Sequence, residues 1–574
     1  MKPQPRSLNA TATSGALTVQ AFVGDGCTLL AFDVKQGSTN GLAGFAIKRQ
    51  SPDGTNVYIE NMLNFTVKLT QDTKEPDVGA AATPSDQAPF QKYRWIDFPN
   101  DVNSGEFTYQ VETRYFDPDE KNLRTGDTVQ VVVTLGSRQG TNFHVGFTRG
   151  YVSSQAYARK FHNEEFRPAA KTPYLFDTKT YQDQWTWLGY HARKMLFDFL
   201  ALAQTDAVAG VDAFIYDVDE PDFVRALESI GKSKKKLRII LDDSKDKEKV
   251  KPDRAGCQTA LEPIIGTKNI LRTHFKVFAH DKVLILRDAA GKAMHVLCGS
   301  ANFSIRGLYV QGNSIIVVDD ADVAGTYGQA FDDAWTSVKT FSAQPIATQW
   351  FKFRDKSDLP EFAVSFAPHK SGEFALQAAE HAVTRAQKNV IFALMSPGSG
   401  NLIADLKKLA NRPEVFSFGV LQTSSFAQQL MQGTSKNGKV ENEISSFQAL
   451  DKVVPKPFLE EFDGGRGMVI HHKFVVVDFN GSDPVVFCGS SNLTAGGEEH
   501  NGDNLLAIYD REIATLYAIE GIRLADHYRF RDVLKTATED KPMSLQGPNR
   551  SPAWYSDYYK AGTAKYRSRI TLIQ

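Results

Sequence analysis

The chain has 574 residues, of which 42% are hydrophobic and 23% are charged, and its formal net charge is −1. This composition is typical of a globular protein of about two to four domains that can bury a sizeable core. It excludes a global electrostatic field that would draw the chain to nucleic acid or to an anionic membrane, so any anion has to be bound by a local cluster of side chains.

The four cysteines form no Cys-x-x-Cys pair and are too sparse for a disulfide framework, which favours a reducing compartment. The first 20 residues contain no apolar segment like that of a signal peptide, and no apolar run is long enough to cross a bilayer. We therefore expect a cytoplasmic protein without a transmembrane segment, and export by a route that needs no signal peptide stays open.

The N-terminal part of the chain has the pattern of an all-β sandwich. Residues 1–15 are small and polar, and we expect them to form a flexible tail. Residues 16–137 contain seven short strand-like runs, separated by turn sequences such as GDG and SPDGT. The late segments FTYQVETRYFD and GDTVQVVV resemble the final strands of fibronectin type III domains, a resemblance that says nothing about chemistry. We expect the sandwich to be a docking or targeting module. Residues 138–185 have few periodic segments and are predicted to be a connector.

From residue 186 onward, helical and strand-like segments alternate, which predicts an α/β fold with a mainly parallel sheet. The helix YHARKMLFDFLALAQ precedes the strands AGVDAFIYDV and KLRIILDDS, and a second series begins with the helix SGEFALQAAEHAVTRAQ and the strand KNVIFALMS. This repetition predicts two related halves, residues 186–345 and 346–540. The aromatic and basic tail, residues 541–574, is expected to pack across the surface rather than to bind nucleic acid.

Each half contains the same short pattern of polar residues around two aliphatic strands. The first half has AHDKVLILRD followed by HVLCGSANFS, and the second has IHHKFVVVD followed by VVFCGSSNLT. Both therefore combine His-x-Lys at the head of one strand with Gly-Ser-x-Asn at the end of the next. His280 precedes Asn302 by 22 residues, and His471 precedes Asn492 by 21 residues. One copy is compatible with satisfied core histidines, but two copies at matched spacing indicate a functional site.

These residue types suit the binding and cleavage of a phosphodiester. An imidazole can attack phosphorus or transfer a proton at neutral pH, and a lysine supplies a point charge for phosphate oxygens. Gly299 and Gly489 allow a tight turn after each strand. Two sets that converge would put one imidazole on each side of the phosphorus, with no need for a metal or a cofactor. The candidate phosphate-binding residues are Lys282, Ser300, Asn302, Lys473, Ser490 and Asn492.

The doubled motif resembles the phospholipase D superfamily, whose signature is His-x-Lys-x4-Asp with a downstream Gly-Ser-x-Asn. The second copy includes the aspartate as Asp478, whereas the first copy has Arg287 at that position. Tyrosyl-DNA phosphodiesterases within the superfamily also lack this aspartate. The resemblance implies two pseudo-symmetric α/β halves that form one catalytic unit, with His280 as the nucleophile and His471 as the general acid and base. Because both half-sites lie in one chain, no homodimer is needed to complete the site.

Each histidine also needs a group that holds its second ring nitrogen. Asn313 follows Asn302 by 11 residues, and Asp503 follows Asn492 by the same number. Related enzymes carry an orienting group at these positions, and it often reaches the histidine of the opposite half. Crossing would pair Asp503 with His280 and Asn313 with His471, which suits His280 as the nucleophile. The sequence leaves the reverse assignment open.

Other readings of these motifs lead to different functions. His472 and His500 suggest a zinc cluster, but the neighbouring lysine disfavours a dication, and we expect no metal. Cys298 and Cys488 are expected to be apolar packing residues. The low net charge favours a phospholipid substrate over a nucleic acid. The alternatives are a nuclease of the same superfamily and a catalytically silent protein that binds phosphate.

Overall fold

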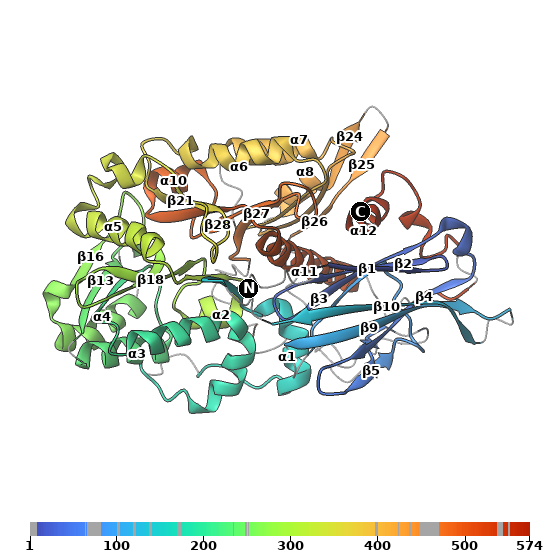
Figure 1. Ribbon diagram of the computed structural model, residues 1–574, viewed down its shortest axis with the longest axis horizontal. Coiled ribbons are helices and arrows are strands. Elements are labelled where there is room, and N and C mark those ends of the chain that lie inside the picture. Colours follow the sequence, from blue (N-terminus) through green and yellow to red (C-terminus); the bar gives the residue numbers. More distant parts are fainter. Residues whose placement is uncertain are drawn as a thin grey trace.

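The N-terminal region consists of two antiparallel four-stranded sheets that share one hydrophobic core. In strand order, one sheet is β1-β2-β3-β8 and the other is β10-β9-β4-β5. Figure 1 shows this sandwich beside the rest of the molecule. The strands are β1 (Asn9–Ser14), β2 (Leu17–Val23), β3 (Thr28–Val34), β4 (Leu42–Gln50), β5 (Asn56–Tyr58), β8 (Arg94–Asp97), β9 (Gly105–Phe116) and β10 (Leu123–Leu135), and the short β6 (Glu60–Asn61) and β7 (Thr83–Pro84) form a separate pair.

The computed structural model describes residues 9–573 except for residues 64, 66–81, 100–103, 119–121, 137–140, 169–173, 234, 247–248, 251, 396–399, 423, 436–437, 447–457, 459–469, 536–543 and 549–550. No described helix is long and apolar enough to cross a membrane.

The expectation of a flexible tail over residues 1–15 is wrong for its second part. Residues Asn9–Ser14 form β1, which pairs with β2 in antiparallel register from Asn9 opposite Phe22 to Ser14 opposite Leu17. The sequence NATATS has no hydrophobic period, so it gives no strand signal of its own. Its partner β2 is strongly apolar, and Gly15, with a φ of +59°, makes the tight turn between them.

The first α/β half is built on a seven-stranded sheet of order β11-β19-β18-β17-β12-β13-β16. Its strands are β11 (Phe143–Phe147), β12 (Gly210–Ile215), β13 (Lys236–Asp242), β16 (Ile270–Thr273), β17 (Lys282–Arg287), β18 (Ala293–Gly299) and β19 (Ser314–Val318), and β14 (Lys245–Asp246) pairs with β15 (Lys249–Val250). Its helices are α2 (Gln182–Ala203), α3 (Pro221–Lys232), α4 (Pro252–Ile265) and α5 (Ala321–Ser337).

The second half repeats this plan on an eight-stranded sheet of order β20-β21-β29-β28-β27-β22-β23-β26. Its strands are β20 (Phe351–Phe353), β21 (Phe362–Ala367), β22 (Asn389–Leu394), β23 (Phe416–Leu421), β26 (Glu443–Ser446), β27 (Lys473–Val477), β28 (Val485–Gly489) and β29 (Asp503–Ile508), and β24 (Gln432–Ser435) pairs with β25 (Gly438–Glu441). Its helices are α6 (Glu373–Arg385), α7 (Asn401–Leu409), α8 (Ser424–Met431), α10 (Ala495–His500) and α11 (Arg511–Lys535). The two α/β halves expected from the repeat are therefore present.

The expectation of a mainly parallel sheet is wrong, because both sheets are mixed. In the first half, β12 pairs with β13 and β13 with β16 in parallel, whereas β17 pairs with both β12 and β18 in antiparallel fashion. The second half has the same arrangement around β27. The connection from β17 to β18 is too short for a crossover and can only join antiparallel neighbours. The two motifs of each half are thus on adjacent strands of a hairpin.

Two segments outside the predicted halves pack against them. Within the predicted connector, residues 138–185, strand β11 pairs with β19 at the edge of the first sheet, and α1 (Ser154–Phe161) follows it. In the C-terminal tail, Trp554 and Tyr558 are buried in the sandwich core. Helix α12 (Ala564–Ile573) follows, and Arg567 on it donates a hydrogen bond of 2.6 Å to the carbonyl oxygen of Glu441. The tail therefore joins the sandwich to the second half.

One large hydrophobic cluster contains buried side chains from both halves, which fixes the halves relative to each other. The ring of Phe143 on β11 lies edge-on to Phe362 on β21 at 5.1 Å between centroids. Helix α11 contributes Tyr517, Ile519 and other buried residues to the same cluster. In Figure 1 this helix runs through the middle of the molecule, between the second sheet and the sandwich.

Candidate active site

The two His-x-Lys motifs lie at the start of equivalent strands. Lys282 is the first residue of β17, and Lys473 is the first residue of β27. The side chains of both lysines are almost fully buried, with 1% and 2% of their surface exposed, and both histidines are 4% exposed. Four groups that can carry positive charge are thus enclosed in the protein, which is costly unless anions compensate them.

The Gly-Ser-x-Asn motifs lie at the end of the neighbouring strands. Gly299 ends β18 and Gly489 ends β28, and each has a φ of +144°. A Cβ atom at either glycine would lie 2.4 Å from a backbone oxygen, that of Ser314 or that of Asn504. Both glycines are therefore required by the close approach of the next strand.

The two halves meet through a matched pair of backbone contacts at the site. Ala279, which precedes His280, forms a parallel bridge with Gly502, which precedes Asp503. Ile470, which precedes His471, forms the same bridge with Gly312, the neighbour of Asn313. Each histidine is therefore held next to the orienting residue of the opposite half.

The crossed orienting contacts expected from the spacing are both present. Nδ1 of His280 lies 2.7 Å from Oδ1 of Asp503, and Nδ1 of His471 lies 2.8 Å from Oδ1 of Asn313. The amide group of Asn313 donates through Nδ2 to the carbonyl oxygen of Gly307 at 2.8 Å, which turns its oxygen toward His471. Because an amide oxygen only accepts, Nδ1 of His471 is the donor, and Nε2 is left to accept or to deliver a proton.

Burial and neighbouring cations disfavour the charged forms of both histidines. Burial lowers the pKa of His280 well below its usual value, and the charges of Lys282 and Lys473 lower it further. The pKa of His471 is lowered by burial and by the same two ammonium groups. Since the lysines of both halves act on both histidines, the four groups form one electrostatic unit. Both imidazoles are neutral at neutral pH and able to act as nucleophile or base.

The lysines themselves are poised to receive an anion. Burial lowers the pKa of Lys282 to about 8 and holds that of Lys473 well below its usual value. Lys473 Nζ lies 3.2 Å from both ring nitrogens of His471 and donates to the carbonyl oxygen of that residue at 2.8 Å. The ammonium group of Lys282 donates to the carbonyl oxygen of His280. A bound phosphate would favour the charged form of both lysines.

The hydroxyl groups of the two motif serines form hydrogen bonds with other side chains of the protein. The hydroxyl of Ser300 donates to Oδ1 of Asn313 at 2.9 Å, and that of Ser490 donates to Oδ1 of Asp281 at 3.3 Å. By contrast, Oδ1 of Asn302 and Oδ1 of Asn492 are buried and have no hydrogen-bond partner among the described residues. The serine hydroxyls are thus engaged with protein groups. The unpaired amide oxygens of the asparagines accept rather than donate, so an asparagine would bind a phosphate oxygen only through Nδ2.

Asp478 and Arg287, the two residues at the motif's aspartate position, both have structural contacts. The carboxylate of Asp478 accepts hydrogen bonds of 2.7 to 2.9 Å from three successive backbone N–H groups at the start of β22, those of residues 387–389. Arg287 forms ion pairs with Asp212 on β12 and with Asp332 on α5. Both residues lie at the far end of their strand from the lysine, so the exchange of Asp for Arg leaves the site's own residues unchanged.

Sequence reasoning missed three residues next to His280. The ring of Tyr216 lies 4.6 Å from that of His280, and the guanidinium of Arg254 lies 4.6 Å from the ring of Tyr216. Arg254 is fully buried, and its positive charge contributes to the lowered pKa of His280. Asp281 accepts from Nδ2 of Asn504 at 2.7 Å, and burial together with the charge of Asp503 raises its pKa to about 7. Only Asp281 lies inside a motif, so the other two carry no local sequence signal.

The remaining candidates lie apart from the cluster. His472 contacts Glu520 on α11 at 2.9 Å, whereas Nε2 of His500 lies 2.6 Å from Nζ of Lys276, so these two histidines do not form a common site. Cys298 and Cys488 are buried, and burial raises the pKa of each thiol to about 12. Both are therefore neutral thiols that pack in the core.

Comparison with known proteins gives a doubled match. A family model described as "Cardiolipin synthase, PLD-like domain" matches residues 198–335 and again residues 381–520. Neither match includes the sandwich, for which the resemblance to fibronectin type III domains stays a prediction. No curated protein sequence is significantly similar to this chain.

Solved structures that match parts of this chain include three proteins. Polyphosphate kinase from Porphyromonas gingivalis is 12% identical with a TM-score of 0.41, over 58% of this chain and 49% of the kinase, so the chain spans about half the length of that protein. Phosphatidylserine synthase from Haemophilus influenzae is 13% identical with a TM-score of 0.39, over 58% and 84% of the two chains. NucT from Helicobacter pylori is 19% identical with a TM-score of 0.22, over 26% and 92%.

Proposed function

The chain belongs to the phospholipase D superfamily, and we propose that it is a phosphodiesterase that works through a phosphohistidine intermediate and needs no metal ion. The observation that carries this proposal is the pair of crossed hydrogen bonds, between His280 and Asp503 and between His471 and Asn313, around two buried lysines. This arrangement holds two neutral imidazoles beside a place for one anion.

In the proposed first step, Nε2 of His280 attacks the phosphorus atom and a P–N bond forms as the P–O bond to the leaving group breaks. His471 gives its Nε2 proton to the leaving oxygen. The carboxylate of Asp503 stabilises the positive charge that develops on His280. For this role His471 must bind substrate in its charged form, which the negative phosphate favours in spite of the low pKa of the empty site.

In the second step, His471 takes a proton from water, the oxygen of that water attacks phosphorus, and the P–N bond breaks. The phosphate monoester leaves and His280 returns to its neutral form. Lys282 and Lys473 compensate the charge of the phosphate throughout. Arg254, which is ion-paired with Asp242, lies over the Tyr216 ring that packs on the first histidine. Asn302 and Asn492 bind the phosphate oxygens through their amide groups.

Phospholipid is the substrate class that we favour, because the net charge of −1 provides no general attraction for nucleic acid. A nuclease that uses the same reaction mechanism is the alternative, since a chain with a net charge near zero can still contain a local basic groove. The name of the matched family model, that of a synthase, supports an alcohol as an alternative acceptor to water in the second step. The sandwich would dock the enzyme to its partner or target.

The test uses bis(p-nitrophenyl) phosphate in the presence of a chelator. We expect turnover that survives chelation and that is lost in His280→Ala and in His471→Ala. The matched control is His381→Ala, which removes an exposed histidine on α6. Turnover that requires an added divalent metal would refute the mechanism, and a fully folded protein without turnover would favour the silent phosphate-binding alternative.

A second experiment separates the substrate classes. The protein is incubated in parallel with phosphatidylcholine liposomes, with single-stranded DNA and with double-stranded DNA. Release of choline alone supports a phospholipase, and release of nucleotides alone supports a nuclease. Addition of ethanol to the liposome reaction distinguishes the acceptors, because transfer gives phosphatidylethanol whereas hydrolysis gives phosphatidic acid.

A further inference from the structure

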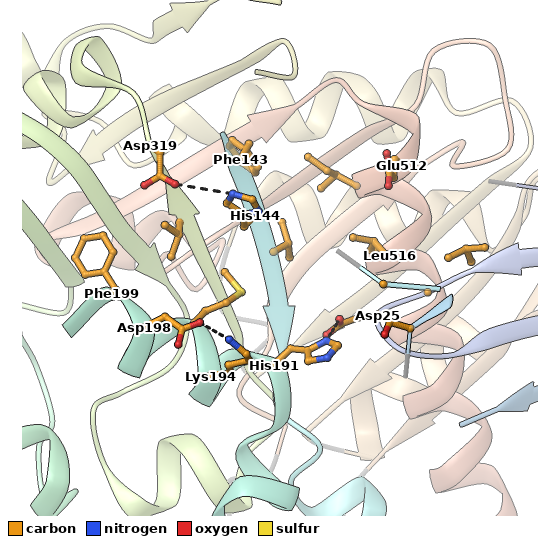
Figure 2. Close-up of a pocket in the computed structure, with 18 of the residues that line it drawn as sticks. Asp25, Phe143, His144, His191, Lys194, Asp198, Phe199, Asp319, Glu512 and Leu516 are labelled. Atoms are coloured by element: carbon orange, nitrogen blue, oxygen red, sulfur yellow. Dashed lines mark hydrogen bonds and ion pairs between the residues drawn. The ribbon is translucent and has the colours of Figure 1, made fainter. Parts of the chain in front are cut away.

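A cavity of about 520 Å³ lies where the sandwich meets both α/β halves. Its lining comes from the turn after β2, from β11 and β19 of the first sheet, and from α2 and α11 (Figure 2). No residue of the His-x-Lys or Gly-Ser-x-Asn motifs lines it. The cavity is therefore separate from the candidate active site, and its volume is in the range of sites that bind small molecules.

The body of the cavity is apolar. The apolar lining includes Val145, Met195, Phe199, Leu202, Val317 and Leu516. Figure 2 shows Phe199 and Leu516 on opposite sides of the hollow. A ligand of this size would bury most of its surface against hydrocarbon, so it needs an apolar body of its own.

The charged groups around this apolar body are mainly acidic. Four carboxylates line the cavity, and Figure 2 shows them on different sides of it: Asp25, Asp198, Asp319 and Glu512. The lining also contains the positively charged Lys194, and its ammonium group lies 2.5 Å from the carboxylate of Asp198. An anionic ligand would meet this excess of negative charge, whereas a cation would be attracted to it.

The two histidines of the lining do not reverse this balance. His191 is paired with Asp25, and His144 lies 3.9 Å from Asp319, which also contacts His295 at 2.9 Å. Burial disfavours the charged form of His191, but the charge of Asp25 and the hydrogen bond to it outweigh burial and raise its pKa. Even with this imidazole charged, carboxylates remain in excess.

We propose that this cavity binds an amphipathic organic cation, a molecule with an apolar body and one ammonium group. The apolar body of the ligand lies against Phe199, Met195 and Leu516, and its ammonium group lies at the rim near Asp198. The candidate active site, with its two buried lysines, attracts anions. A cationic probe therefore distinguishes the cavity from the candidate active site.

Isothermal titration calorimetry on the full chain with hexyltrimethylammonium tests the proposal, with hexanoate and hexanol as matched probes of the same chain length. We expect one saturable site for the cation, binding at least about tenfold weaker for hexanoate, and an intermediate affinity for hexanol. Butyl, hexyl and octyl cations should bind about threefold more tightly for each added methylene until the cavity is filled.

Two variants locate the binding. Asp198→Lys changes an exposed charge at the rim, where 64% of the side chain is exposed, and should weaken cation binding about tenfold. Met195→Trp places a larger side chain in the apolar part of the cavity and should abolish binding of the cation. The control is Asp206→Lys, the same charge change at an exposed position in the loop after α2 that does not line the cavity.

Three results would overturn the proposal. The first is that wild type gives no saturable signal with any of the cations. The second is that hexanoate binds as tightly as the cation and competes with it for the same site. The third is that Asp198→Lys binds the cation as tightly as Asp206→Lys does, which would put the cation elsewhere. If Met195→Trp fails to fold, Asp198→Lys and its control still decide the question.

Discussion

Nδ1 of His280 lies 2.7 Å from Oδ1 of Asp503, although 223 positions separate the two residues in the chain. The equivalent contact in the other direction joins His471 to the neutral amide of Asn313 at 2.8 Å. The backbone arrangement around the two histidines is thus the same in both halves. The group that contacts the histidine differs, because it is a charged carboxylate for His280 and a neutral amide for His471. A carboxylate stabilises an imidazolium that persists through an intermediate, whereas an amide only fixes the tautomer. This asymmetry supports His280 as the nucleophile.

The asymmetry gives the first prediction. Asp503→Asn should lower kcat about 100-fold or more, because the imidazolium of the intermediate loses its counter-charge. Asn313→Asp should cost less, since it adds a carboxylate beside a histidine that only transfers protons. The measurement is kcat for the aryl phosphodiester in both variants, with thermal unfolding as a check of the fold. A larger loss in Asn313→Asp than in Asp503→Asn would reverse the two roles.

A second prediction concerns the leaving group. His471→Ala should retain much of the first step with p-nitrophenyl esters, because p-nitrophenolate leaves without a proton, and should lose it with alkyl esters. The covalent phosphohistidine should then accumulate and be detectable after rapid quenching at alkaline pH. His280→Ala should show neither burst nor label with any ester. Label in His280→Ala that is absent from His471→Ala would identify His471 as the nucleophile.

The sequence predicts the contacts of the candidate site better than it predicts the framework around it. The motif spacing is enough to identify the four basic residues and the crossed partners Asp503 and Asn313, because each motif is local and the family resemblance supplies the crossing. Arg254 could not be found in this way, since its place beside the Tyr216 ring depends on how α4 packs against the sheet. Strand β1 was missed because its pairing comes from β2 rather than from its own residues.

The third prediction is a bell-shaped dependence of kcat/KM on pH for p-nitrophenyl esters, whose leaving group needs no proton from His471. Burial raises the pKa of Asp503 to about 6, so below that pH the carboxyl is protonated and cannot stabilise the imidazolium. Burial lowers the pKa of Lys282 to about 8, so above that pH the ammonium charge is lost and binding of the anionic substrate weakens. The pKa of Lys473 is also lowered, which adds to the alkaline fall. The rate should therefore be highest between these two pH values.

The Asp503→Asn variant is the control for the pH profile. Its remaining activity should lack the fall below about pH 6, because position 503 no longer carries a carboxyl group. Its alkaline fall should move to lower pH, since Asp503 no longer supports the charge of Lys282. An acid limb with the same midpoint in wild type and variant would show that another group controls it.

The fourth prediction is that the motif aspartate, Asp478, stabilises the fold and takes no direct part in catalysis. Asp478→Asn keeps a residue type that tolerates the positive φ of 51°, but it weakens the acceptor of three backbone N–H groups. We expect a loss of about 1–3 kcal/mol in the free energy of unfolding and a kcat within a few-fold of wild type. Urea denaturation and the aryl ester assay measure the two effects. A large loss of kcat with unchanged stability would give Asp478 a direct role.

The fifth prediction is that restoring the family's aspartate in the first half is harmful. Arg287→Asp removes the guanidinium that pairs with Asp212 and Asp332, and it adds a third carboxylate next to them. Asp212 is 2% exposed, so its charge would be buried with Arg238 as its remaining ion-pair partner among the described residues. We expect a loss of about 3–5 kcal/mol in the free energy of unfolding, whereas Arg287→Lys, which retains the charge, should cost clearly less. Because Arg287 and Lys282 lie at opposite ends of β17, the folded fraction should keep its kcat. Equal stability of Arg287→Asp and wild type would show that these ion pairs do not hold the first sheet together.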